Sequence, residues 1–261
     1  MKVEPQVVDR SPAPSMGASE KTLRVLEAAI RHSRFTDIVE DAGLAKATVH
    51  RILSTLVDEQ FITGDSQHGY HPGSRFLGIA GRAISRLDIS AIAEPIVEGL
   101  VRDVDCTVHV GVENGYEMVY VMRRDSSKPY RMASRVGLSI PMHCTGMGKA
   151  VLSSWTPEQV ERMAAEVGLP ARTEQTITDV SRLHDELALT RDRGYAMDLG
   201  ENEHGTTCVS APIRDHQGRV RYGISVSSIA LEHPGSSISQ FAPQAIAAAD
   251  AISAALGAPA Q

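Results

Sequence analysis

The residues best able to do covalent chemistry in this sequence are three cysteines, Cys106, Cys144 and Cys208, and ten histidines. Cys208, His143 and Asp198 supply the side-chain types of a nucleophile, a base and an orienting carboxylate. The sequence around Cys208 matches no pattern typical of a cysteine hydrolase, and nothing in the spacing brings His143 beside it. We therefore predict that the protein is not an enzyme, and hydrolysis by Cys208 stays an alternative.

A second possibility for these side chains is zinc binding, because thiolates and imidazoles are usual zinc ligands. The four candidates are His143, Cys144, His204 and Cys208. His204 and Cys208 are four residues apart, which suits a helix, yet the residues between them have the pattern of a loop and a strand. We predict no metal and no cofactor, and a structural zinc near His143 or Cys208 stays open.

Small polar residues alternate with apolar ones along two predicted strands, residues 206–213 and 220–228. We expect a hairpin in which Arg214 lies opposite Arg219. The pairs that follow from this register are Cys208 with Ser225 and Thr206 with Ser227. Because side chains alternate across a strand, these four side chains share one face, where small polar groups could surround and hydrogen-bond a ligand.

The opposite face of the same hairpin is apolar and suits packing under helices. It carries Val209, Ala211, Tyr222, Ile224 and Val226. Two simpler interpretations of the polar face stay open. The serines could face water on a half-exposed sheet, and Cys208 could be a small buried hydrophobe.

A glycine-rich segment, Gly146-Met147-Gly148, precedes a predicted helix that begins at the next residue. The first N–H groups of a helix have no partner inside it and attract anions. We therefore expect these three amides to bind a carboxylate, with Met132, Ile140 and Met147 as flexible apolar walls. Alternatively, the glycines only shape a turn.

The strongest helical pattern in the first third of the chain begins near Lys46. Its apolar side carries Val49, Ile52, Leu53, Leu56 and Val57 at helical spacing. Its other side carries Lys46, Thr48, His50, Arg51, Ser54 and Thr55. Cations and hydroxyls near a helix start suit DNA phosphates and base edges. A solvated helix in a small helical domain is the alternative.

Two shorter helices precede this one. Ser19 and Thr36 are predicted to cap their starts, and Gly43 is predicted to end the second. The first contains Leu23, Leu26 and Ile30 at helical spacing. A hairpin follows, with strands at 61–63 and 70–71 and a loop between them at 64–69. Two helices with a tight turn, followed by a hairpin, form a winged helix-turn-helix.

After residue 88 the pattern changes to helices interleaved with strands. Helices are predicted at 75–87, 89–104, 157–167 and 180–193, with a last one that carries Ile238, Phe241, Ala245, Ala248 and Ile252. Further strands are predicted at 107–112 and 117–122, and a long loop at 129–148. The expected domains are a disordered tail at 1–18, a winged helix-turn-helix at 19–73, a linker helix at 74–88 and a larger domain at 89–257.

The composition describes an ordinary water-soluble chain of 261 residues, with 42% hydrophobic and 22% charged residues. No apolar run approaches the roughly 20 residues that cross a bilayer, and the N-terminus lacks a signal-peptide pattern. An odd number of cysteines without a C-x-x-C pair suits a reduced cytoplasm. Because the net charge is −6, DNA binding must depend on a local basic patch.

Several stretches resemble the IclR (isocitrate lyase regulator) family of bacterial transcription regulators. DAGLAKATVHRILSTLVDEQFI is similar to the family's DNA-recognition segment, and YHPGSRFLGIAG resembles the end of its wing and the start of its linker helix. PMHCTGMGKAVL and MDLGENEHGTTCVSAPIRDHQGRVRYGISVSS resemble its effector domain. With DISAIAEPIVEGLVRDV, the resemblance extends from about residue 19 to residue 255.

The resemblance implies an α+β chain with an N-terminal winged helix-turn-helix, a linker helix, and a C-terminal GAF-like or profilin-like effector domain, an antiparallel sheet flanked by helices. With the helix face, it predicts DNA contacts by Thr36, Lys46, Ala47, Thr48, His50, Arg51 and His68. It places the effector site at Met132, Ile140, Gly146, Met147, Asp198, Cys208, Ser225 and Ser227. The chain departs from the family in both domains. Ala45 stands where Pro is common, Ala47 where Ser is common, and Pro72 where Leu is common. In the loop of the effector domain, Gly146 and Met147 stand where Ala is common.

The predicted function is that of a ligand-responsive DNA-binding transcription regulator, a repressor of a catabolic operon. Its effector is expected to be a small carboxylate or an aromatic acid, amide or hydrazide. Its other expected partners are double-stranded operator DNA and itself, as a dimer or tetramer, and no membrane. Besides the hydrolase, the alternative is a small-molecule-binding signalling module that does not bind DNA.

Overall fold

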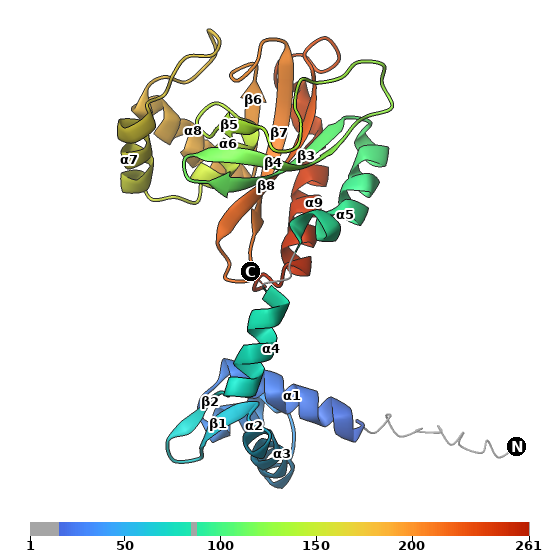
Figure 1. The fold of residues 1–261 in the computed structure, drawn as a ribbon, viewed down its shortest axis with the longest axis vertical. Coiled ribbons are helices and arrows are strands. Elements are labelled where there is room, and N and C mark those ends of the chain that lie inside the picture. The colour runs from blue at the N-terminus through green and yellow to red at the C-terminus, as the bar shows by residue number, and fades with distance from the viewer. Residues whose placement is uncertain (1–15, 85–87, 261) are drawn as a thin grey trace, which may run out of the picture. The chain divides into compact units, whose positions relative to one another are not determined.

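A computed structural model describes residues 16–84 and 88–260 of the chain (Figure 1). The chain divides into two compact units, Met1–Arg86 (unit 1) and Leu87–Gln261 (unit 2). Across these described residues, every helix is too short or too polar to cross a bilayer.

Unit 1 consists of three helices, a two-stranded antiparallel sheet and a fourth helix. They are α1 (Ala18–Arg31), α2 (Phe35–Ala42), α3 (Lys46–Asp58), β1 (Ile62–Asp65), β2 (Gly69–Pro72) and α4 (Ser74–Ile84). The apolar side of α3, with Val49 and Leu53 fully buried, packs with Val25 of α1 and Ile38 of α2 in one core. Since that stripe is inside, the polar side of the same helix must face outward. This arrangement confirms the predicted winged helix-turn-helix.

The starts of α1 and α2 differ from the prediction that Ser19 and Thr36 cap them. The last residues with extended backbone are Gly17 and Arg34, so each helix begins one residue before the expected cap. A capping residue needs a non-helical backbone, which Ser19 and Thr36 do not have. The Thr36 hydroxyl instead donates to Asp37 Oδ1 at 3.0 Å.

Gly43 ends α2 as predicted, because its φ of 62° lies in the left-handed region that glycine adopts without strain. The expected tail at 1–18 falls mostly on residues 1–15, which lie outside the described residues. Its last residue, Ala18, is helical rather than disordered.

The wing and the linker helix also have different bounds from those expected. Gly64 and Asp65 are part of β1 and pair with β2, which shortens the loop at the wing tip to residues 66–68. Helix α4 is described as far as Ile84, and residues 85–87 of the predicted linker lie outside the described residues. Asp88 is not in the linker helix. Its carboxylate accepts a hydrogen bond from the Ser90 N–H at 2.9 Å and caps the next helix.

Unit 2 is built on a six-stranded antiparallel sheet in the order β5-β4-β3-β8-β7-β6. Its elements in chain order are α5 (Ile89–Val104), β3 (Thr107–Asn114), β4 (Glu117–Arg124), β5 (Ser139–Pro141), α6 (Gly146–Leu152), α7 (Pro157–Val167), α8 (Val180–Arg193), β6 (Ala196–Leu199), β7 (Thr206–Arg214), β8 (Val220–Ile229), the 3-10 helix η1 (Gly235–Phe241) and α9 (Ala242–Ala255). Together with unit 1, this confirms the predicted α+β class.

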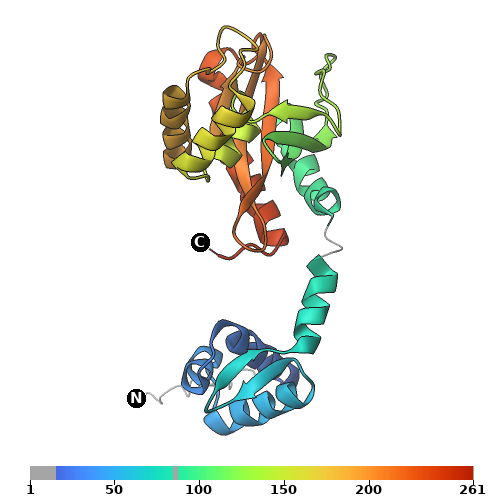
Figure 2. The same cartoon turned by 60° about the vertical axis from the view of Figure 1, so that its left-hand side comes forward.

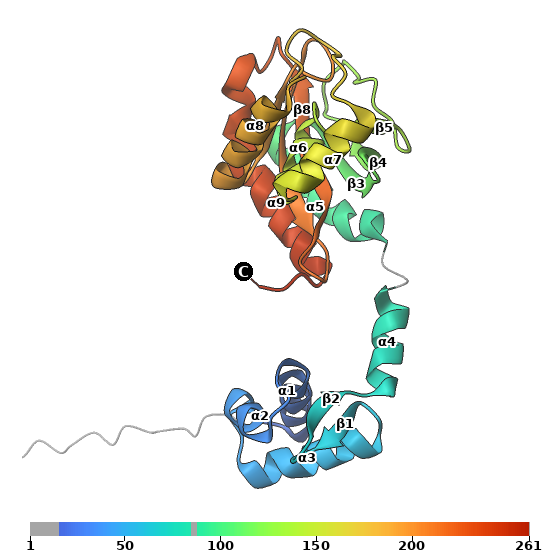
Figure 3. The same ribbon diagram turned by 90° about the vertical axis from the view of Figure 1, so that its left-hand side faces the viewer.

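Helices cover both faces of the sheet (Figures 2 and 3). On one face α5 and α9 pack on the apolar side chains of β3, β7 and β8, including Val108, Val209 and Ile224. On the other face α6, α7 and α8 form a second core with Met118 and Met142. The predicted apolar face of the β7–β8 hairpin therefore lies under α5 and α9, and its polar face points to the side of α6.

Three parts of unit 2 differ from the sequence prediction. The expected loop at 129–148 contains β5, and β6 was not predicted, because strands of three and four residues show too little alternation to be recognised. The last helix is interrupted. Ile238 and Phe241 belong to η1, and α9 starts afresh at Ala242, with Pro243 at a position where its missing N–H costs nothing.

The register of the β7–β8 hairpin is shifted by two residues from the predicted one. Cys208 pairs with Ser227 rather than with Ser225, and Arg214 pairs with Val220 rather than with Arg219. One residue of the shift comes from a longer turn and the other from a bulge between Ile213 and Arg214. Because the shift is even, every side chain keeps its predicted face.

Candidate functional site

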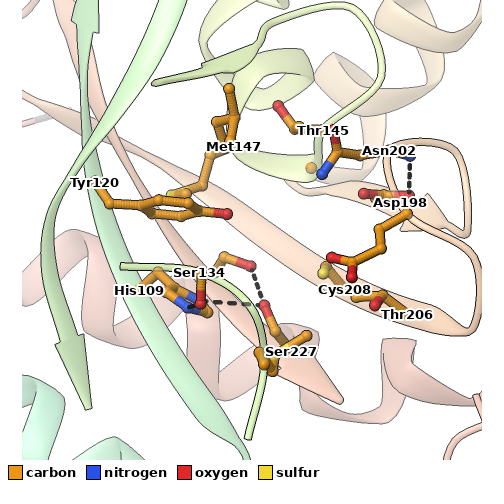
Figure 4. Close-up of a pocket in the computed structure, with 15 residues that line it drawn as sticks. His109, Tyr120, Ser134, Thr145, Met147, Asp198, Asn202, Thr206, Cys208 and Ser227 are labelled. Atoms are coloured by element: carbon orange, nitrogen blue, oxygen red, sulfur yellow. Dashed lines mark hydrogen bonds between the residues drawn. The ribbon is translucent and has the colours of Figure 1, made fainter. Parts of the chain in front are cut away.

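A cavity lies in unit 2 between the polar face of the sheet and the start of α6 (Figure 4). All eight residues that the sequence placed in the effector site line it: Met132, Ile140, Gly146, Met147, Asp198, Cys208, Ser225 and Ser227. The free space inside is about 30 Å³. Since a water needs at least about 10–15 Å³ in this measure, the cavity has room for little more than ordered water unless a wall moves.

Seven further residues line the cavity, and only Thr206 among them was expected on this face. The others are His109, Tyr120, Ser134, Thr145, Asn202 and Glu203. His109 alternates with Val108 and Val110 along β3, which indicates that it faces away from the α5–α9 core. Its place beside Ser227 depends on the pairing of β3 with β8, which are more than a hundred residues apart in sequence.

A chain of hydrogen bonds runs through His109 along one wall of the cavity (Figure 4). His109 Nε2 lies 2.7 Å from Ser134 Oγ, and Nδ1 lies 3.4 Å from Ser227 Oγ, which in turn lies 2.9 Å from Ser225 Oγ. Burial lowers the pKa of His109 to about 3, so the imidazole is neutral, with one donor and one acceptor nitrogen. These groups are therefore able both to donate to and to accept from a polar ligand.

The neighbouring strands β7 and β6 bring a thiol and a carboxyl group to the cavity, and burial changes the pKa of each. Burial raises the pKa of Cys208 to about 12, so this thiol is protonated and weakly nucleophilic. Burial also raises the pKa of Asp198 to about 7, although the nearby Lys149 ammonium lowers it. Near neutral pH the carboxyl group can therefore donate a proton in a hydrogen bond as well as accept one.

The nucleophilic arrangement considered for Cys208 is not formed. Asp198 pairs with Cys208 across β6 and β7, but His143 Nε2 lies 3.2 Å from the carbonyl oxygen of Pro170 and does not line the cavity. The zinc alternative has no geometric support either. Throughout the described residues, no three His, Cys, Asp or Glu side chains are gathered in a way that could hold a metal ion.

Three backbone amides at the start of α6 were predicted to be free for a carboxylate, and one of them is not. The helix begins at Gly146 rather than at Lys149, and Thr145 caps it by accepting a hydrogen bond from the Gly148 N–H at 3.2 Å. The Gly148 amide is therefore not available to a ligand. This glycine packs against the backbone of Met142 so closely that a Cβ would overlap its carbonyl oxygen.

The cavity wall that carries Asp198 is tied to α6 by a buried ion pair. Lys149, which is 1% exposed, donates through Nζ to Glu201 Oε1 and lies 3.8 Å from Glu186 of α8. Asp198 Oδ1 accepts the Glu201 N–H at 2.7 Å, and Thr176 Oγ1 donates to the Glu201 carbonyl oxygen at 2.7 Å. The segment after β6 is thus held in place by charge and by backbone hydrogen bonds.

The raised pKa of Asp198 predicts how stability depends on pH. The unfolded carboxyl has a pKa of about 3.9, so between pH 4 and 7 the folded state binds this proton more tightly, and its stabilising contribution is lost as pH rises toward 7. Urea unfolding of the wild type and Asp198→Asn, at about pH 5 and about pH 8, checks this. From pH 5 to pH 8, we expect the free energy of unfolding of the wild type to fall by about 2 kcal/mol more than that of the variant. An equal pH dependence in both proteins would contradict the assignment.

In unit 1, the predicted DNA contacts on α3 form one surface. Lys46, Ala47, His50 and Arg51 are exposed, and Thr48 is half-buried. The other two predicted contacts are exposed on neighbouring elements, Thr36 in the first turn of α2 and His68 in the turn between β1 and β2. His68 lies beside the Asp65 carboxylate, with 3.0 Å between Nδ1 and Oδ2.

One side of α3 also borders a groove of about 260 Å³ that the sequence did not indicate. Thr48 and Arg51 line it from α3, and Lys21 and Thr22 line it from the first turn of α1. Cations and hydroxyls from two helices suit a phosphate oxygen better than those of one helix. Lys21 was missed because its side chain comes near Arg51 only through the packing of α1 on α3.

Comparison with known proteins identifies the family. The family model described as "Bacterial transcriptional regulator IclR C-terminal" matches residues 81–254, and the one described as "IclR helix-turn-helix domain" matches residues 20–66. The chain belongs to the IclR family. Regulators of this family bind operator DNA and small-molecule effectors, so the chain is a transcriptional regulator with a helix-turn-helix DNA-binding domain.

Individual IclR-family relatives match along most of the chain. HTH-type transcriptional regulator XynR of Escherichia coli (strain K12) is 30% identical over 95% of this chain and 100% of that protein. Transcriptional repressor IclR of the same organism is 28% identical over 85% of this chain and 82% of that protein. The crystal structure of Agobacterium tumefaciens repressor BlcR matches with a TM-score of 0.74 and 27% identity, over 92% of this chain and 96% of that one. XynR is named as a transcriptional regulator, and IclR and BlcR are named as repressors.

Proposed function

We propose that this protein is a repressor that binds operator DNA through α3 and the wing of unit 1, and is controlled by a small organic acid bound in the cavity of unit 2. The observation that carries the proposal is the set of hydroxyl, imidazole and carboxyl groups that converge on one buried cavity, in a unit separate from the exposed cationic face of α3. A purely structural core would not bury so many polar groups around free space.

The chemistry of the cavity favours a small carboxylic acid as the effector. Ser225 and Ser227 can donate to carboxylate oxygens, and a protonated Asp198 can do the same. Met147 and Met132 supply flexible apolar walls that can move aside for a larger ligand, as the small free space requires. An aromatic acid, or its amide or hydrazide, uses the same donors and acceptors.

Self-association into a dimer, or a dimer of dimers, is part of the proposal. Leu23 of α1 is 61% exposed, and Leu77 of α4 is 57% exposed. Both lie in unit 1, where an apolar contact between two copies would hide them. A two-fold pair of recognition helices addresses a pseudo-palindromic operator. The names of the relatives IclR and BlcR, both described as repressors, support repression as the output.

Replacement of Arg51 tests the DNA-binding half of the proposal. Duplexes that bind the full chain are first selected from a random library, and their affinity is then measured by fluorescence anisotropy. Arg51→Ala is expected to weaken binding by about 5- to 150-fold, because it removes a guanidinium contact worth about 1–3 kcal/mol, and to leave the melting temperature unchanged. The salt dependence of binding should also become shallower.

The matched control is Arg102→Ala, which changes the net charge equally on an exposed position of α5 in unit 2. Its DNA affinity should stay within about twofold of the wild type, since long-range charge effects are screened. If selection enriches no duplex, or if Arg51→Ala binds the selected duplex as tightly as Arg102→Ala does, α3 is not the DNA-contacting helix.

A further inference from the structure

A second groove lies in unit 2, between the end of α6, the end of α8 and the β7–β8 hairpin. Its volume is about 570 Å³, and it shares no residue with the cavity proposed for the effector. Its lining residues are Ser153, Ser154, Trp155, Pro157, Thr190, Arg191, Gly194, Pro212, Arg214 and Val220. The groove therefore combines apolar walls with two cationic side chains and no carboxylate.

Backbone oxygens, not carboxylates, hold the two arginines of this groove. Arg191 Nη1 donates to the Ser153 carbonyl oxygen at 3.2 Å, and Arg214 Nη1 lies 3.4 Å from the Gly218 carbonyl oxygen. Across the part of the chain that the structure describes, no carboxylate lies within ion-pair distance of either guanidinium. Each side chain is held by a backbone oxygen and keeps further N–H donors free.

Two nearby arginines, unlike Arg191 and Arg214, are paired with carboxylates. Arg219 donates to Asp215 at 2.9 Å, and Arg193 donates to Glu186 at 2.7 Å. A neighbouring groove of about 480 Å³ shares Ser154, Trp155, Arg214 and Val220 with the first one. Arg214 therefore stands where the two grooves join. The second groove also contains Glu113, whose carboxylate lies 3.9 Å from Arg221 and makes no ion pair with Arg214.

We propose that Arg191 and Arg214 form a second binding site, which takes the oxyanion group of a small metabolite, a carboxylate or a phosphate. A guanidinium presents its N–H donors in a planar fork that matches the oxygens of either group. Trp155, Pro157 and Pro212, which also line the groove, supply apolar surface for the remainder of the ligand. The hydroxyl of Thr190, another lining residue, is a further buried donor that has no partner among the described residues.

This site would give the regulator a second chemical input, independent of the cavity under α6. Two separate sites allow one ligand to change the affinity for the other, or for DNA, through a shared conformational equilibrium. The inference does not depend on the proposed effector cavity, because the two sites have no residue in common.

Isothermal titration calorimetry of the full chain with citrate, and separately with inorganic phosphate, tests the site. At low ionic strength we expect saturable binding of at least one anion, with a dissociation constant of about 1 mM or tighter. Arg214→Gln and Arg191→Gln should each weaken it by about tenfold or more, since each removes a bidentate charged contact. The preferred anion shows whether the natural ligand presents a carboxylate or a phosphate.

Two controls separate this site from its alternatives. Ser225→Ala/Ser227→Ala alters the effector cavity and should leave binding at the groove unchanged, and Arg102→Gln removes an exposed charge elsewhere with no effect. Melting curves identify any variant that does not fold, and the other arginine variant then gives the result. Absence of saturable binding by both anions overturns the proposal, as does binding that survives in a folded Arg214→Gln or Arg191→Gln protein.

Discussion

Replacing Lys149 by alanine is expected to destabilise unit 2 by about 3–5 kcal/mol, the cost of leaving a buried charge without its partner. Lys149 is 1% exposed, and its ammonium lies between Glu201 and Glu186. Burial already raises the pKa of Glu201, whose Oε2 has no hydrogen-bond partner among the described residues, so its charge depends on Lys149. Urea unfolding followed by circular dichroism measures the loss.

Two further variants show whether charge is the cause. Arg24→Ala removes one member of the exposed Arg24–Glu20 pair at 3.5 Å, and it should cost less than about 1 kcal/mol. Adding Glu201→Gln to Lys149→Ala should recover part of the lost stability, because it removes the uncompensated carboxylate. If the double variant is no more stable than Lys149→Ala, the loss comes from packing and not from an unpaired charge.

Replacing Ser225 and Ser227 together by alanine is expected to weaken effector binding by about tenfold or more. Each hydroxyl would lose a hydrogen bond to the ligand, worth about 1.5–3 kcal/mol when the partner is a carboxylate. The two hydroxyl oxygens lie 2.9 Å apart and both side chains are buried in the cavity wall, so one carboxylate group can accept hydrogen bonds from both. A thermal-shift screen of small organic acids against the wild type finds the effector, because a bound ligand raises the melting temperature.

The effector found in that screen is then titrated into the double variant by calorimetry. The matched control is Ser236→Ala/Ser237→Ala, two exposed serines of η1 that are outside the cavity. That control should bind as the wild type does. Wild-type affinity in the Ser225→Ala/Ser227→Ala protein would place the effector elsewhere.

The sequence was sufficient for the parts of the fold that depend on local periodicity. The buried stripe of α3, the end of α2 at Gly43 and the two faces of the β7–β8 hairpin follow from spacing, together with the properties of glycine. The polar face was correct even though the register was not. An even shift of two residues moves each side chain along the strand but not across the sheet.

The parts that could not be predicted depend on contacts between distant segments. His109 meets Ser227 because β3 pairs with β8, and Lys149 meets Glu201 although 52 positions separate them. No periodicity within either segment contains that information. The predicted starts of α1 and α2 were wrong for a different reason. Ser19 and Thr36 are good capping residues, but the extended backbone that a cap requires ends two residues earlier, at Gly17 and Arg34.

The central claim is that a ligand in unit 2 controls the DNA affinity of unit 1. Its most direct test is the dissociation constant of the full chain for its selected duplex, measured by anisotropy with and without a saturating amount of the acid found in the thermal-shift screen. The account predicts a change of about 5- to 150-fold, corresponding to a coupling of about 1–3 kcal/mol. An acid that binds the cavity, stabilises the protein and leaves the duplex affinity unchanged would contradict it.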